Sequence, residues 1–397
     1  MNPLPLQEPA ADTSAGVPDQ FHPFPHPSSD TARVALLQQA PDLATILRLT
    51  GDRRTALITR ASPDGEQQGD ALCLSAAEVL ALGSDGLARL RGASEKPLIL
   101  ECRGTRLFTR GSIGNGDLRI HKGERFQLAR APSDCIAGLP AVICSDSHAV
   151  AALSPGARVW IGQSLGARVE ERRFGTAILE VTDCPARGKR LKGGKTIRLP
   201  DTPLALAALA EEEHQAILVA ARHVDLLLLP AGTEAESRHL VPPLVRRGGR
   251  RKALPLAVRI DNRAALEQLG QWLPDESGAP CAALLLDHRA LALDLGAGAW
   301  ARLAPTVMGR CHAHGLPLMG ELDEADLSAL RAPGGRAERL IFHRHAQALL
   351  LPLTMEADII DQLAQDLEQP EPSAVRAPVR LWRDQPESGR SASCTAP

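Results

Sequence analysis

The chain has 397 residues, of which 44% are hydrophobic and 23% charged, so it is long enough for two domains with a large core. Its formal net charge of −2 excludes a strong overall field toward nucleic acid or an anionic membrane. With six Phe, four Trp and no Tyr, a stacking platform for single-stranded nucleic acid is not expected either.

The sequence predicts no targeting or anchoring segment. Its first residues lack the basic start and apolar stretch of a signal peptide. No apolar run approaches the roughly 18 residues that a membrane helix needs. The eight Cys include no CxxC pair and no zinc-finger spacing, which favours reduced thiols in a cytoplasmic protein.

Three apolar runs in the first third of the chain, 55–61, 70–75 and 96–102, predict strands. The stretch 76–92 has two interpretations: one helix, or a helix whose end (GLARLRGAS) is a strand. In the second interpretation Glu95 alone separates two strands, whereas a parallel crossover needs about a dozen residues. The helix is therefore favoured.

Residues from about 112 to 195 have a different pattern. DLRIHKGERFQLAR and ARVWIGQSLGARVEERRFGTAILEVTD alternate apolar and polar residues around Gly turns. This alternation is typical of antiparallel β structure.

From residue 204 onward, short apolar runs recur at intervals of about 30 residues, the length of one βα unit. They begin near Leu226, Leu256, Leu284, Leu318 and Leu349. Apolar runs buried on both faces indicate parallel strands, so the second half predicts a closed barrel or a doubly wound sheet.

Several strings resemble segments of pyruvate kinases, in the order that this family has them. The strings are RTALITRAS (54–62) for the first strand, KPLILECRGTRLFTRG (96–111) for the third, AVRIDN (257–262) for the fifth and CHAHGLPLM (311–319) before the seventh. The resemblance covers about residues 54–368. It implies an α/β fold, a TIM-type (β/α)8 barrel with an inserted small antiparallel β domain. The family's C-terminal regulatory domain has no counterpart here.

The resemblance also implies the domain boundaries. These are a tail (1–30), the first part of the barrel (31–111), the inserted β domain (112–195), the second part of the barrel (196–368) and a second tail (369–397). Both tails offer too little apolar surface to offset chain entropy, so we expect them to be disordered.

Pyruvate kinases transfer a phosphoryl group between phosphoenolpyruvate and ADP with Mg²⁺ and K⁺, which are therefore the implied cofactors of an active chain. Such chemistry rests on positioning and charge neutralisation. Arg259 stands at the family's catalytic Lys, and Asp261 at a metal-binding Glu. Side chains two apart on a strand share a face, here at the end of a barrel strand. The alternative to a catalytic pair is a structural ion pair that caps the barrel.

The same resemblance supplies the other candidates. Arg89, Arg103 and Lys195 are the implied substrate-binding residues, and Glu101 stands at the metal-binding Asp of the third strand. For Lys195 the alternative is a solvated side chain in the basic run RGKRLKGGK.

The family's second metal carboxylate is missing, because Ala290 takes its position. Asp287 or Asp294 replaces it as a metal ligand only if the register shifts. The Thr that follows strand seven is also lost near Leu322, where Glu321 brings negative charge toward an anionic substrate.

These losses predict a catalytically impaired relative whose barrel mouth still binds a phosphoenolpyruvate-like anion, a nucleotide or a protein partner. An active pyruvate kinase with altered metal ligands is the first alternative. A 2-oxo acid lyase or aldolase, with Arg259 holding a carboxylate, is the second. No nucleic acid or membrane partner is expected, and a homo-oligomer is left open. The pairs HAH (312–314) and HRH (343–345) are interpreted as surface histidines.

Overall fold

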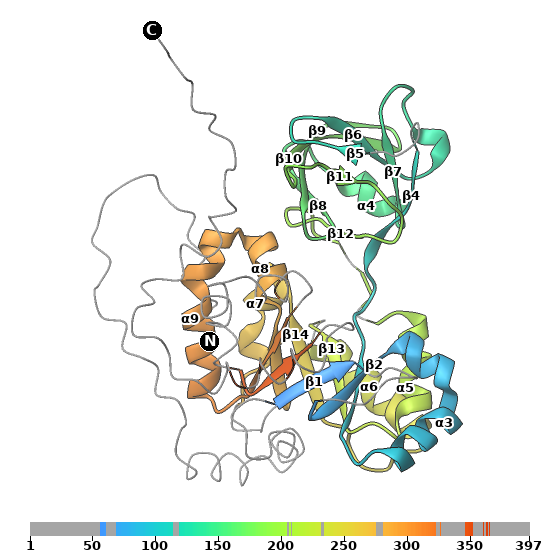
Figure 1. Ribbon diagram of the computed structural model, residues 1–397, viewed down its shortest axis with the longest axis vertical. Helices are drawn as coiled ribbons and strands as arrows, with labels where there is room; N and C mark the ends of the chain where they lie inside the picture. The colour runs from blue at the N-terminus through green and yellow to red at the C-terminus, as the bar shows by residue number, and fades with distance from the viewer. Residues whose placement is uncertain are drawn as a thin grey trace, which may run out of the picture.

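The chain forms two β-barrels, joined where it leaves and re-enters the first of them (Figure 1). The computed structural model describes residues 56–60, 69–113, 119–204, 206–207, 209–231, 234–274, 281–322 and 346–351, with Asp326, Ile360, Leu363 and Gln365. The expected tails and the HRH pair lie outside these residues.

The first barrel is a closed sheet of parallel strands in the order β1-β17-β16-β15-β14-β13-β3-β2. Its strands are β1 (Ala56–Arg60), β2 (Ala71–Ser75), β3 (Leu98–Glu101), β13 (Leu226–Pro230), β14 (Leu256–Ile260), β15 (Ala283–Leu286), β16 (Leu318–Glu321) and β17 (Ala348–Leu350). The pairing of β1 with β17 closes the sheet. The apolar runs thus predicted these strands correctly, and the closed parallel barrel is confirmed.

Successive residues of each strand face two different cores. In β13, Leu226 and Leu228 belong to the barrel interior, whereas Leu227 and Leu229 pack outward among helix residues. This follows from the two-residue period of a strand. Because both faces are buried, the strand reads as an unbroken apolar run in the sequence.

Helices lie outside the first barrel. They are α3 (Ala76–Ala93), α5 (Glu211–Ala220), α6 (Glu234–Arg247), α7 (Arg263–Glu267), α8 (His288–Leu295) and α9 (Ala297–Ala313), with a 3-10 turn, η2 (Leu269–Gln271). The helical interpretation of 76–92 is confirmed, because Ser75 and Glu78 form a capping box that begins α3. The helix is kinked at Gly83, whose φ of 63° suits a residue without Cβ.

The expected alternation of one helix with each strand holds only in part. Two helices, α8 and α9, connect β15 to β16, and the connection from β3 to β13 contains the second barrel before α5. Among the described residues, no helix stands between β1 and β2. The finer description as a (β/α)8 barrel therefore remains a prediction.

The second barrel is closed in the order β10-β6-β7-β4-β12-β8-β9. Its strands are β4 (Leu107–Ile113), β6 (Arg125–Ala129), β7 (Ala141–Cys144), β8 (Arg158–Ile161), β9 (Leu165–Arg173), β10 (Thr176–Asp183) and β12 (Thr196–Arg198). The expected purely antiparallel pairing is wrong at one place, because β6 and β7 are parallel. A connection with a 3-10 turn, η1 (Pro132–Asp134), returns the chain to the same end of the barrel before β7 begins.

Two smaller elements complete this part. Helix α4 (Ser147–Ala152) adds Ala149 and Val150 to the core of the second barrel. Strands β5 (Arg119–Ile120) and β11 (Lys189–Arg190) form a separate two-stranded sheet. No helix in the described part of the chain has the length and hydropathy to cross a membrane.

Candidate functional site

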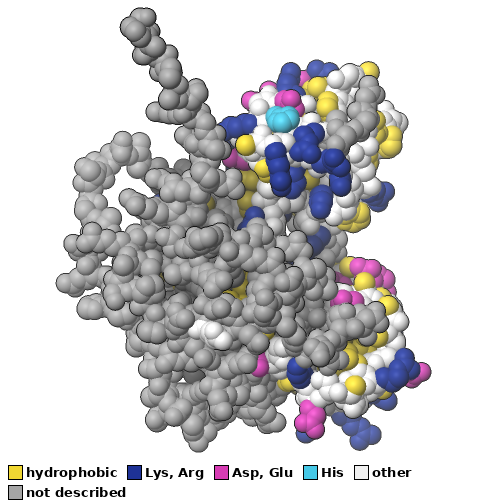
Figure 2. Space-filling model, viewed as in Figure 1, with side chains coloured by type: hydrophobic (Ala, Val, Ile, Leu, Met, Phe, Trp, Pro, Cys, Tyr) yellow, Lys and Arg dark blue, Asp and Glu magenta, His cyan; other side chains and the backbone are white. Residues whose placement is uncertain are grey.

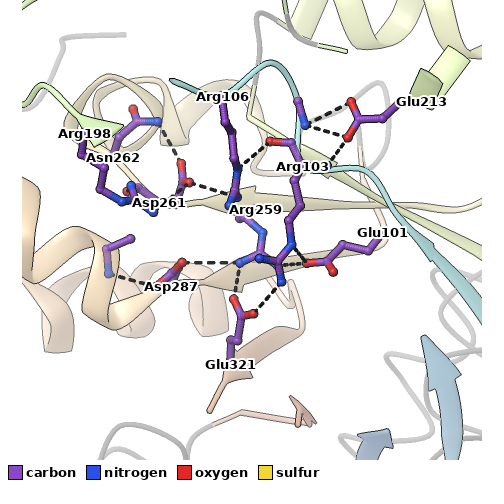
Figure 3. A network of polar contacts seen from close by, with 12 residues as sticks. Glu101, Arg103, Arg106, Arg198, Glu213, Arg259, Asp261, Asn262, Asp287 and Glu321 are labelled. Atoms are coloured by element: carbon purple, nitrogen blue, oxygen red, sulfur yellow. Dashed lines mark hydrogen bonds and ion pairs between the residues drawn. The ribbon is translucent and has the colours of Figure 1, made fainter. Parts of the chain in front are cut away.

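Four acidic side chains and four arginines meet at the carboxyl ends of the first barrel's strands, where active sites of such barrels lie (Figure 3). We call them the strand-end cluster. Its members are Glu101 of β3, Arg259 of β14, Asp261 after β14, Asp287 after β15, Glu321 of β16, Arg103 and Arg106 between β3 and β4, and Arg198 of β12. The cluster lies where the chain leaves for the second barrel and returns from it.

Arg259 is the centre of the cluster, and its side chain is only 1% exposed. Its guanidinium donates to Glu101 through Nη2 and to Glu321 through Nη1. The same Nη1 lies 3.4 Å from Oδ2 of Asp287. Figure 3 shows these three carboxylates arranged around one guanidinium. The expected pairing of Arg259 with Asp261 is not seen; Arg259 points into the barrel, toward other strands.

The charges of this group shift one another's protonation. Burial disfavours the Arg259 cation, but Glu321, Glu101 and Asp287 outweigh that effect and raise its pKa. Burial and the neighbouring Glu321 raise the pKa of Asp287, against the opposing effect of Arg259. Burial also disfavours the ionised form of Glu321, but the positive charges of Arg259 and Arg103 outweigh burial and lower the pKa of Glu321. Arg259 and Arg103 thus hold Glu321 ionised, whereas the pKa of Asp287 lies above that of an ordinary aspartate.

Arg103 joins the same acids from the rim. Its Nε lies 2.9 Å from Glu101, and its Nη2 lies 3.2 Å from Glu321. The backbone at Arg103 and Gly104 is held by Glu213 of α5, which accepts their N–H groups at 2.5 and 2.9 Å. Glu213 also accepts the N–H of Ala210, which begins its own helix. One buried carboxylate therefore fixes both the start of α5 and the segment that carries Arg103.

Asp261 forms a looser group with Arg106 and Arg198. Its Oδ2 lies 3.9 Å from Arg106 Nη2 and 3.6 Å from Arg198 Nη2, beyond the 2.7–2.9 Å typical of charge-assisted hydrogen bonds. Arg198 also donates from Nη1 to the Asp261 carbonyl oxygen at 3.1 Å. Burial and the positive charges of Arg103 and Arg259 lower the pKa of Arg106 to about 10. Positive charge is therefore concentrated on this side of the cluster.

A divalent cation does not fit this arrangement. Glu101, Asp287 and Glu321 converge on the guanidinium of Arg259, which occupies the position between them. Asp261 is turned instead toward two other arginines. Among the residues that the structure describes, no three His, Cys, Asp or Glu side chains are grouped to hold a metal ion. The acidic residues proposed as metal ligands, Glu101, Asp261 and Asp287, are partners of arginines here.

Two proposed substrate residues lie away from the cluster. Arg89 is exposed near the end of α3, two residues before Arg91, which pairs with Asp225 at the start of β13. That position is at the opposite, amino end of the barrel. Lys195 is exposed before β12, where its backbone pairs with Thr109 of the second barrel.

Asp294 likewise lies outside the cluster. It is buried within α8 and accepts the backbone N–H of Arg263 at 2.6 Å. It therefore links α8 to the start of α7. Asp287, by contrast, reaches the cluster and also caps α8 by accepting the N–H of Ala290.

Sequence reasoning missed three residues that the structure brings to the site: Arg106, Arg198 and Glu213. It noted Glu321 as a negative charge near the substrate position, but not as a partner of Arg259. Glu321 ends β16, and a polar residue at the end of an apolar barrel strand was the signal of its place in the cluster. Arg198 ends β12, a short strand of the second barrel without an apolar run, so the same signal does not apply to it. Arg106 and Glu213 carry no such signal, since one lies in an irregular segment and the other inside a run of three Glu.

Comparison with known proteins gives no family. The chain matches no protein-family model, and no curated protein matches it either.

Proposed function

We propose that this protein is a pyruvate-kinase-like barrel protein that binds a small carboxylate or phosphate anion at its strand ends and transfers phosphoryl groups poorly or not at all. In this proposal the first barrel is a degenerate (β/α)8 barrel. The observation that carries it is the position of Arg259, whose guanidinium is held by Glu101, Asp287 and Glu321. Because both terminal nitrogens of this guanidinium already contact carboxylates, Arg259 has little capacity left for a transferring phosphoryl group.

The anion-binding part rests on Arg106 and Arg198. Both side chains are partly exposed, at 26% and 20%, and both guanidiniums lie at a long distance from the carboxylate of their shared partner Asp261. An anion that enters between them gains charge-assisted hydrogen bonds and relieves the repulsion that lowers the pKa of Arg106. Arg103 is less suited, because Glu101 and Glu321 already accept its hydrogen bonds.

A coupled assay of pyruvate formation from phosphoenolpyruvate and ADP, with Mg²⁺ and K⁺, tests the proposed loss of phosphoryl transfer. Kinases typically turn over at about 1–100 s⁻¹. We expect a rate far below this range. A rate within it refutes the proposal and favours an active pyruvate kinase with altered ligands.

Calorimetry with phosphoenolpyruvate tests the proposed anion binding. We expect binding that Mg²⁺ does not strengthen and that Arg198→Ala weakens about tenfold, the effect of losing one charge-assisted contact worth about 1.5 kcal/mol. Arg91→Ala is the matched control, since it also removes a half-buried arginine with an acidic partner, but at the opposite end of the barrel. Binding that requires Mg²⁺, or equal losses in both variants, contradicts the proposed site.

A further inference from the structure

One side of the second barrel carries a dense basic surface, although the whole chain is nearly neutral. Residues 184–198 contain six basic side chains and no acidic one. Figure 2 shows Lys and Arg side chains grouped over this barrel, at the upper right. A net charge of −2 therefore conceals a strong local asymmetry, and local fields decide association with charged partners.

The fold brings further basic residues beside this segment. Strand β11 pairs with β5, which places Arg190 opposite Arg119. Arg119 donates to the carbonyl oxygen of Arg187 at 2.7 Å. Gly188, at φ 74°, lies so close to the His121 ring that an added Cβ would stand 2.7 Å from it. The two strands thus form one basic ribbon.

The same surface continues onto β4. The carbonyl oxygen of Lys195 accepts the N–H of Thr109, and its own N–H donates to the Thr109 hydroxyl. Thr109 Oγ1 also donates to the carbonyl of Lys192 at 2.6 Å. Exposed residues flank Thr109 on both sides, Phe108 and Arg110. We call the combined surface the basic face; it comprises Phe108, Arg110, Arg119, His121, Lys122, Arg187, Lys189, Arg190, Lys192 and Lys195.

The positive charges of the basic face are close enough to repel one another. Burial lowers the pKa of Lys189, and the charges of Lys195, Arg187 and Arg289 lower it further. Arg289 belongs to α8, so the field reaches the first barrel. The nearby Glu124 accepts the backbone N–H of His121. A polyanion on this face relieves the mutual repulsion.

Phe108 distinguishes this face from a simple charged surface. Its ring is 45% exposed, and Thr196, the neighbour of Lys195, stands opposite it in the β4–β12 pair. Phe174 is also exposed, but it lies outside the basic face and packs against the Arg130 guanidinium, 4.7 Å from its ring centroid. Basic side chains that track phosphates, with a ring on which a base stacks, are the elements of single-strand recognition.

Against the expectation from overall charge and aromatic content, we propose that the basic face binds a single-stranded nucleic acid, holding its phosphates with Lys and Arg side chains and stacking one base on Phe108. This binding is separate from the strand-end cluster, since the two sites have no residue in common. The low aromatic content makes the contact mainly electrostatic, so sequence preference is expected to be weak.

Fluorescence anisotropy with a labelled 20-nucleotide single strand tests the proposal on the full chain. If the protein contacts about five phosphates, its affinity should fall about 100-fold between 50 and 200 mM salt. The charge reversal Arg190→Glu, Lys192→Glu, Lys195→Glu is expected to abolish binding. Phe108→Ala is expected to weaken it at least fivefold, the low end of the stacking range of about 1–3 kcal/mol, without changing the salt slope.

The matched control is the reversal Arg246→Glu, Arg247→Glu, Lys252→Glu, which makes the same charge change on exposed residues of the first barrel. It should retain at least half of the wild-type affinity, and unchanged thermal unfolding verifies the fold of each variant. No binding at 50 mM salt, equal losses in the two reversals, or full affinity of Phe108→Ala overturns the proposal. Binding to phosphatidylserine vesicles in place of the oligonucleotide also overturns it, since the face then serves a membrane.

Discussion

The guanidinium of Arg259 donates to the carboxylate of Glu101, although the two residues are 158 positions apart in the sequence. They come from strands that are not adjacent, since β13 lies between β3 and β14. The contact spans the barrel interior at the strand ends and is almost completely buried. A buried ion pair of this kind ties the two halves of the first barrel together on either side of the inserted barrel.

Replacing Arg259 by Met is therefore expected to destabilise the protein strongly. The change leaves Glu101 and Glu321 with the partly exposed Arg103 as their remaining cationic partner. Breaking a buried ion pair by removing one partner typically costs about 3–5 kcal/mol. Chemical denaturation followed by circular dichroism measures the free energy of unfolding. Arg91→Met serves as the control, because the partly exposed pair with Asp225 should contribute under about 1 kcal/mol. Equal losses in the two variants would show that Arg259 has no special structural role.

Arg259→Lys tests whether the shape of the guanidinium, or its charge alone, stabilises the fold. An ammonium is a point charge, whereas the guanidinium presents its donors in a planar fork that reaches several carboxylates at once. We expect the free energy of unfolding of the Lys variant to lie between that of wild type and that of Arg259→Met. We also expect it to show no gain in pyruvate formation, since the three carboxylates remain. A gain of tenfold or more would mean that this one side chain limits catalysis.

Asp287→Asn is expected to change the pH dependence of stability. The pKa of Asp287 is raised in the folded protein, so the folded state binds more protons than the unfolded state above the ordinary value of 3.8. The free energy of unfolding therefore falls as pH rises through that window. Asn removes this decline and still caps α8. Melting temperatures between pH 4 and 7 should favour the variant increasingly as pH rises.

Glu321→Gln is expected to change the pH dependence of stability in the opposite direction to Asp287→Asn. The pKa of Glu321 is lowered in the folded protein, so its ionised form stabilises the fold above the ordinary value of 4.5. That contribution is lost as pH falls through the lowered pKa. The Gln variant should therefore be less stable than wild type at neutral pH, with the difference shrinking in acid. Parallel pH profiles for the two variants would contradict both assignments.

The strands of the first barrel could be predicted from the sequence because local patterns determine them. Runs such as 226–230 are apolar on both faces, which only a covered parallel sheet produces. The parallel pairing of β6 with β7 could not be predicted, because alternation fixes which face a residue takes and not the direction of its neighbour. Closure of the second barrel depends on the same long-range pairing.

The sequence predicted where the site residues lie in the barrel better than it predicted which of them pair with one another. Arg259, Glu101, Asp261 and Asp287 were placed correctly at strand ends, since that follows from the strand pattern. Which acid faces Arg259 depends on where each side chain points once the barrel closes, and Glu321 took the place expected for Asp261. The resemblance proposed Arg89 as a substrate residue, although the helix favoured for 76–92 already placed it outside a barrel strand, and the structure has it on that helix.

Glu213 is expected to control the strand-end cluster from a distance. It is buried and accepts three backbone N–H groups, from Arg103, Gly104 and Ala210. Glu213→Ala leaves these donors unsatisfied, so we expect a loss of about 3 kcal/mol in the free energy of unfolding. Faster amide hydrogen exchange at Arg103 and Gly104 distinguishes this cause from a general loss of helix α5. Unchanged exchange at those two amides would contradict the proposed contact.

Two buried thiols should be inert in the native protein. Burial raises the pKa of Cys281 and of Cys311 to about 12. The thiolate is the reactive form, so at pH 8 each reacts about a thousandfold more slowly than an ordinary thiol. Iodoacetamide labelling followed by peptide mass spectrometry should modify the half-buried Cys184 first and the other two only after denaturation. Early labelling of Cys281 would mean that the packing around α9 and β15 opens faster than the reagent reacts, which the tight burial of Trp272 and Trp300 in the same core argues against.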